Sequence, residues 1–330
     1  MAAKKHLILI HGRSTKPSEA AKALMVTRAL KHGLDRVDPS GKASQSLDNG
    51  KVKFDFVYYG DIANQRMLEK NKSLKKQLTA TDPKYNCPCE PTEKYTEALD
   101  RLLQQMSHTK AAYKAFLKEQ KDSRWMDNAA AAVSWLANLT GFSDEVISRA
   151  TADMGAYLME RKTGSAIRQR LQAPLREALL NQHDICLVSH SMGCIVSYDV
   201  LWKFSQMSEY RDVQDSKNRV KLWLTLGNPL GEPGVRKNLY DSNERDDGRF
   251  PKEIIDRWIN ISARDDFVSH DADIADDFAE MKKMKYAREI KDLEEVYTFW
   301  VNEQGTNPHK FYGYLDNPTV AKQILNWMQT

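Results

Sequence analysis

The sequence predicts an α/β protein in which helices cover both faces of a mostly parallel β-sheet. Short continuous apolar runs, such as residues 7–10, are typical of strands that are buried on both faces of such a sheet. Segments with helical spacing of apolar residues separate these runs, so strands and helices alternate along the chain. Residues that carry chemistry follow several of the strands, which is where open parallel sheets place their functional groups.

The predicted strands are short and end at turn residues. They cover residues 7–10, 51–59, 184–189, 219–226, 256–263 and 296–301. Gly227, Asn228 and Pro229 follow the fourth of these strands and indicate a turn. The charged stretch 271–295 carries helix signals, so we expect it to lead by a helix into the last strand.

Three of the predicted helices have recognisable boundaries or breaks. The first helix pattern is closed by Gly33. The helix over residues 165–180 contains Pro174, which we expect to kink or split it. The final helix begins at Pro318 with Asn317 as its N-cap, and its apolar stripe is expected to face the sheet.

The chain is predicted to contain a core and a large insertion. Residues 1–60 and 165–330 form the α/β core, and residues 61–164 form a helical cap, because this stretch is much too long for one crossover helix. Apolar residues of the cap, such as Trp125 and Trp135, have three possible roles. They would line a pocket for a hydrophobic acyl or lipid-like substrate, form the cap's own core, or form a dimer interface. These alternatives stay open.

Composition excludes several classes of protein. The net charge of +4 is spread along the chain and gives no reason to expect nucleic acid as a partner. No apolar stretch reaches the roughly 18 residues of a membrane span, so we expect a soluble cytoplasmic protein without an integral membrane segment. The four cysteines have the spacing of neither a zinc site nor a disulfide framework, so we expect reduced thiols and no metal. A homo-oligomer is compatible with the sequence.

A serine lies at the junction between the third predicted strand and the helix that follows. This residue, Ser191, is expected to occupy a sharp, strained turn that lifts its hydroxyl above the sheet. The positions two before and two after it face closely packed backbone and must be small, and Ser189 and Gly193 meet this requirement. In this pattern the chain resembles the α/β-hydrolases of the serine esterase and lipase type, with Ser189 where that family usually has glycine.

The resemblance implies that Ser191 is the nucleophile and that two backbone N–H groups form an oxyanion hole. One N–H belongs to Met192, the residue after the nucleophile. The other is assigned to Arg13, because the family's His-Gly signature matches His11 and Gly12 after the first strand. The Arg13 side chain would either face the pocket and favour acidic substrates or pair with a loop carboxylate on the surface.

The family order of serine, acid and histidine along the chain leaves few candidates for the acid and the base. His309 follows the last predicted strand, where the resemblance places the base. Asp265 and Asp266 both follow the fifth strand, and the family's spacing from Asn260 favours Asp266 as the acid. His270 is the weaker candidate for the base. The remaining residues assigned to substrate binding are Gly12, His190 and His270.

The resemblance implies a serine hydrolase that cleaves a carboxylic ester of acyl or lipid-like character through an acyl-enzyme intermediate, without a cofactor. Thioesterase, amidase and lysophospholipase activities use the same chemistry and stay open. The alternative is a hydrolase-fold protein that binds a ligand or a partner without turnover. The sheet is expected to begin at the strand before Gly12 and to lack the first antiparallel strands of larger family members.

Overall fold

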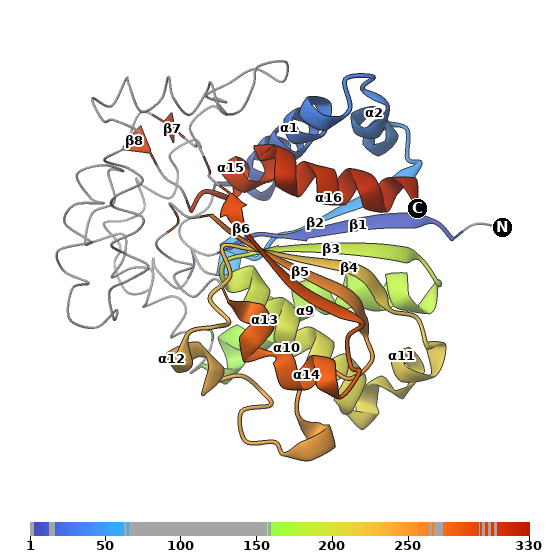
Figure 1. Ribbon diagram of the computed structural model, residues 1–330, viewed down its shortest axis with the longest axis vertical. Helices are drawn as coiled ribbons and strands as arrows, with labels where there is room; N and C mark the ends of the chain where they lie inside the picture. Colours follow the sequence, from blue (N-terminus) through green and yellow to red (C-terminus); the bar gives the residue numbers. More distant parts are fainter. Residues whose placement is uncertain are drawn as a thin grey trace.

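A computed structural model defines the fold. The structure describes residues 3–12, 17–62, 65, 157, 160–263, 266, 273–296, 298, 301–302, 305–306 and 309–330. These residues form a six-stranded sheet with helices on both faces (Figure 1), so the predicted α/β class is confirmed. The cap predicted over residues 61–164 lies almost entirely outside the described residues.

The strands of the main sheet all run in the same direction. They are β1 (Lys5–Ile10), β2 (Val52–Val57), β3 (Asp184–His190), β4 (Val220–Leu226), β5 (Ile255–Ala263) and β6 (Glu289–Val296). Their order is β2-β1-β3-β4-β5-β6, and each neighbouring pair is parallel. The chain leaves β1 toward β2 and returns to the other side of β1 through β3. This reversal makes the carboxyl ends of β1 and β3 the expected place for a functional site.

Helices pack on both faces of the sheet (Figure 1). One face carries α1 (Glu19–Val37), α2 (Lys42–Asp48), α15 (Phe311–Asp316) and α16 (Pro318–Gln329). The other face carries α9 (Arg161–Leu180), α10 (Met192–Gln206), α11 (Arg211–Ser216), α13 (Ile274–Asp277) and α14 (Ala279–Lys283). A short helix, α12 (Pro233–Arg236), lies in the segment between β4 and β5.

Strand β1 shows why the short apolar runs predict the sheet. Leu7 and Leu9 point into the apolar core beneath α1 and α16, and Ile8 and Ile10 point into the core beneath α9 and α10. All four side chains are completely buried. Successive side chains of a strand alternate between faces, so a strand with helices on both sides must be apolar throughout.

The prediction of a last strand over residues 296–301 is wrong. The sixth strand is β6, which ends at Val296, and residues 301–302 instead form the small antiparallel pair of β7 (Val301–Asn302) and β8 (Gly305–Thr306). Strand β6 lies at the edge of the sheet, and its sequence mixes charged residues with buried ones such as Ile290. This mixture explains why the stretch 271–295 reads as a charged helix in the sequence.

The prediction that Gly33 closes a helix is wrong, and Pro174 does not split the helix that contains it. Gly33 does not close α1, which continues to Val37. A Cβ at Gly33 would lie 2.1 Å from the backbone oxygen of Leu315, so the glycine allows α15 to pack closely on α1. Helix α9 runs through Pro174 as one element, and Leu171 and Leu175, which lie in the turns around the proline, are completely buried.

The predicted start of the final helix is confirmed. The side chain of Asn317 accepts a hydrogen bond from the Thr319 N–H at 2.8 Å, and Pro318 occupies the first turn of α16. None of the helices in the described ranges has the length and hydropathy needed to cross a lipid bilayer.

Candidate active site

The candidate site begins at the turn between β3 and α10. Ser191 has φ 54° and ψ −129°, a conformation that residues with a side chain rarely adopt and that costs about 1–3 kcal/mol. Its backbone N–H donates to the carbonyl oxygen of Leu226 at 2.9 Å, which ties the turn to the end of β4. Ser191 therefore occupies the strained strand-to-helix turn that the sequence predicts.

Small residues on both sides of Ser191 allow this turn to pack closely. A Cβ at Gly193 would lie 2.8 Å from the carbonyl oxygen of His11, so α10 approaches the end of β1 too closely for a side chain. Ser189 is completely buried, and its hydroxyl lies 2.8 Å from Ser197 Oγ and accepts the indole N–H of Trp223 at 3.0 Å. These partners explain how the buried Ser189 side chain is accommodated beside the turn.

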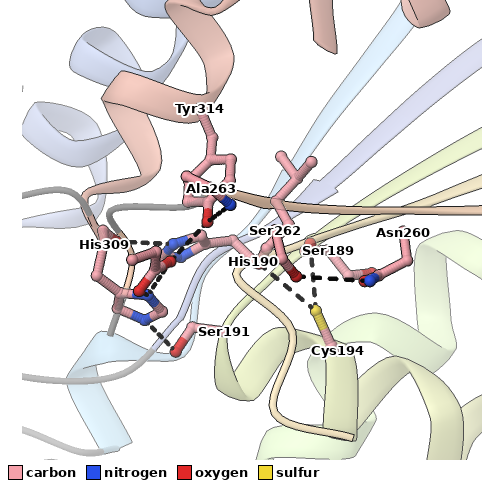
Figure 2. Close-up of polar contacts among 11 residues, drawn as sticks. Ser189, His190, Ser191, Cys194, Asn260, Ser262, Ala263, His309 and Tyr314 are labelled. Carbon is pink, nitrogen blue, oxygen red and sulfur yellow. Dashed lines mark hydrogen bonds and ion pairs between the residues drawn. The ribbon is translucent and has the colours of Figure 1, made fainter. Parts of the chain in front are cut away.

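Three segments that are far apart in the sequence meet at the carboxyl edge of the sheet. His309 Nε2 lies 2.8 Å from Ser191 Oγ, and His309 Nδ1 lies 2.8 Å and 2.9 Å from the two carboxylate oxygens of Asp266. Figure 2 shows Ser191 and His309 pointing toward one another. Because the carboxylate can only accept, Nδ1 carries the proton and Nε2 accepts the hydrogen bond from the Ser191 hydroxyl.

The acid is held firmly in place. The Asp266 side chain is 0% exposed, whereas the His309 side chain remains 15% exposed. The Asp266 N–H donates to the carbonyl oxygen of Ala263 at 2.9 Å, and the Tyr314 hydroxyl donates to Asp266 Oδ2 at 2.6 Å. The structure therefore brings Asp266 against His309, as the spacing from Asn260 predicts. Asp265 lies outside the described residues.

Gly227 belongs to the site although the sequence indicates only a turn there. It follows β4 with φ 53°, and an added Cβ would lie 2.8 Å from Asp266 Oδ2 and 3.0 Å from His309 Nδ1. The missing side chain makes room for the acid–base pair. The signal in the sequence is a glycine directly after a buried strand, but its neighbours Asp266 and His309 are too distant in the chain for that role to be recognised.

His190 and Gly12, both assigned to substrate binding, contact the candidate triad itself. The Nε2–H of His190 donates to the backbone carbonyl of His309 at 2.9 Å. Its ring stacks on Phe311 with centroids 4.9 Å apart, and the residue is only 5% exposed. A Cβ at Gly12 would lie 2.6 Å from the Cβ of Ser191. His270 lies outside the described residues.

One half of the predicted oxyanion hole can be described. Met192 is the first residue of α10, so its N–H has no acceptor within the helix and the positive end of the helix dipole lies beside Ser191. Arg13 lies outside the described residues, but the start of its loop is anchored. His11 Nε2 accepts the Tyr59 N–H at 3.1 Å, and the Tyr59 hydroxyl donates to the His11 carbonyl at 2.7 Å.

Of the described cysteines, Cys194 lies nearest to Ser191 in the sequence, and it is not set up to act as a nucleophile. Cys194 lies one residue beyond Gly193, and its Sγ–H donates to the Ser189 carbonyl at 3.3 Å. Burial raises the pKa of the Cys194 thiol well above its ordinary value, so the thiol stays protonated. Cys186 is likewise buried and free, whereas Cys87 and Cys89 lie outside the described residues.

The described part of the chain holds no group of three or more histidine, cysteine, aspartate or glutamate side chains suited to a metal ion. Comparison with known protein families, curated proteins and solved structures finds no match to this chain. The arrangement of Ser191, His309 and Asp266 must therefore be interpreted from its own geometry, which is that of a nucleophile, a general base and an orienting acid.

Proposed function

We propose that this protein is a serine hydrolase of the α/β-hydrolase type that cleaves carboxylic esters. The observation that carries the proposal is the hydrogen-bonded chain from Ser191 Oγ through His309 to the buried carboxylate of Asp266. The strained backbone of Ser191 and the order of serine, acid and histidine along the chain add support.

The roles of the residues follow from these contacts. Ser191 Oγ attacks the ester carbonyl while His309 Nε2 takes the hydroxyl proton, and Asp266 stabilises the resulting imidazolium. The Met192 N–H donates to the oxyanion that develops on the carbonyl oxygen. The imidazolium then gives its proton to the departing alcohol, which leaves an acyl group on Ser191. Water attacks this acyl-enzyme, with His309 again as the base, and releases the acid.

Only the central parallel strands of the described sheet match the sheet of an α/β-hydrolase. The sheets of α/β-hydrolases normally include one antiparallel strand, whereas the six described strands of the main sheet are all parallel. The proposal therefore rests on the site and on the central strands around it. The nucleophile follows β3, and the strand that carries the His-Gly pair, β1, lies beside it.

Labelling with a fluorophosphonate probe tests the proposal. The probe reacts with activated serine hydroxyls, so the wild-type chain should be labelled and Ser191→Ala should not. Ser197→Ala is the matched control, because Ser197 is a buried serine of α10, the helix that follows Ser191, and its hydroxyl contacts Ser189. Absence of labelling in folded wild-type protein would favour the alternative of binding without turnover.

The substrate class requires a second experiment. Hydrolysis of p-nitrophenyl esters with increasing acyl length should depend on Ser191 for every ester that is cleaved. Higher kcat/KM with longer acyl chains would support an acyl or lipid-like substrate. A preference for short, water-soluble esters would contradict it, and parallel assays with thioesters and amides would separate the related activities.

A further inference from the structure

The hydroxyl of Tyr314 lies behind the acid of the candidate triad. It accepts the backbone N–H of Ala263 at 2.9 Å (Figure 2). It donates to Asp266 Oδ2 at 2.6 Å. A phenol carries a single proton, and a carboxylate oxygen can only accept. The proton of Tyr314 is therefore directed to Asp266, and the Ala263 N–H holds the phenol oxygen at the end of β5.

The position of Tyr314 is fixed by the segment that also carries the base. Tyr314 lies on α15, which begins two residues after His309, and its side chain is completely buried. Helix α15 packs tightly on α1, where Gly33 lets the Leu315 carbonyl approach. One short, well-supported segment thus supplies both the imidazole and a donor to its partner carboxylate.

We propose that Tyr314 is a positioning residue that fixes the orientation of Asp266 and, through Asp266, the imidazole of His309. The inference rests on the proposed hydrolase function and deepens it. His309 Nδ1 lies at nearly equal distances from Asp266 Oδ1 and Oδ2, so this contact alone does not select one rotation of the carboxylate. The short hydrogen bond from Tyr314 to Oδ2 selects it.

The variant Tyr314→Phe removes this hydrogen bond and keeps the aromatic ring. The loss of one hydrogen bond to a charged group should lower kcat about 10- to 100-fold, while KM stays within about twofold because no group that contacts substrate changes. Turnover of p-nitrophenyl butyrate by the full-length chain provides both constants.

Tyr312→Phe is the matched control. Tyr312 is a buried tyrosine of the same helix, but its hydroxyl accepts a hydrogen bond from Lys22 and lies 3.7 Å from Met25 Sδ, both on α1. This variant also loses a buried hydroxyl contact, so it should show a comparable loss of thermal stability with kcat within about twofold of wild type. Equal reductions of kcat in Tyr312→Phe and Tyr314→Phe would overturn the positioning role.

A double-mutant cycle separates positioning from a general structural effect. In the Asp266→Ala background the hydroxyl of Tyr314 has no carboxylate to orient, so Tyr314→Phe should change the residual kcat by less than about twofold. A reduction as large as in the wild-type background would overturn the proposal, because it would show that Tyr314 acts independently of Asp266. All variants are compared well below their thermal midpoints.

The outcome for the wild-type chain separates the two proposals. If the wild type neither hydrolyses the ester nor reacts with the fluorophosphonate probe at Ser191, the hydrolase function fails and the role of Tyr314 fails with it. If the wild type and Tyr312→Phe are active and Tyr314→Phe equals them in kcat, the positioning role alone fails.

Discussion

Replacing Gly227 with alanine would place a methyl group against both the acid and the base of the candidate triad. The added Cβ would lie 2.8 Å from Asp266 Oδ2 and 3.0 Å from Nδ1 and Cε1 of His309, inside van der Waals contact. The backbone φ of 53° adds a cost of about 1–2 kcal/mol for a residue with a side chain. Because the acid or the base must move by several tenths of an ångström, we also expect kcat to fall by about 100-fold.

Gly50→Ala separates these two effects. Gly50 has φ 72°, and an added Cβ there would meet no atom within 4 Å. Urea unfolding should show a loss of about 1–2 kcal/mol in Gly50→Ala and a larger loss in Gly227→Ala, where the steric clash adds to the backbone cost. Ester hydrolysis should be impaired only in Gly227→Ala. A kcat for Gly227→Ala equal to that of Gly50→Ala would refute the reasoning that Gly227 makes room for the acid–base pair.

Three further predictions concern stability. Gly33→Ala should lower stability by about 1–3 kcal/mol in thermal unfolding, because its Cβ would lie 2.1 Å from the Leu315 carbonyl oxygen. Burial raises the pKa of Asp199 to about 6 from an ordinary 3.8, so the folded state binds a proton more tightly than the unfolded chain and stability falls as pH rises between these values. This is tested by urea unfolding of the wild type and Asp199→Asn at about pH 7 and about pH 5. Acidification should raise the free energy of unfolding of the wild type by about 1 kcal/mol more than that of the variant. An equal change in the two proteins would contradict this. Ser191→Gly should be more stable than Ser191→Ala by about 1 kcal/mol, because glycine relieves the positive φ, while neither variant reacts with the fluorophosphonate probe.

The predictability of each strand depends on how it is buried. Strands β1, β3 and β4 lie between neighbours and between two layers of helices, so their sequences are mainly apolar. Strand β6 has one neighbour and mixes charged residues with buried ones, a pattern that solvent-facing helices share. Gly33 misleads for a related reason, because its contact with Leu315 depends on tertiary packing that no local pattern encodes.

Some residues of the candidate site can be predicted from the sequence, and others cannot. Ser191, Asp266 and His309 can be found from the sequence because their residue types stand in a recognisable order after predicted strands. Gly227 and Tyr314 cannot, because a glycine after a strand reads as a turn and nothing local tells which tyrosine of α15 faces the acid. Tyr314 and Asp266 are 48 positions apart, and only the packing of α15 brings them together.

Two energetic costs of folding coincide at this edge of the sheet. Ser191 holds a backbone conformation that costs about 1–3 kcal/mol, and the Asp266 carboxylate is fully removed from solvent, which costs several kcal/mol unless the charge is paired. A stable core needs neither feature, since glycine would relieve the strain and apolar residues often replace a buried ionic pair without loss of stability. The proposed hydrolase function would explain both costs, because it requires that a hydroxyl, an imidazole and a carboxylate be held in line. A site that only binds a ligand does not need this alignment, so the geometry favours turnover over binding alone.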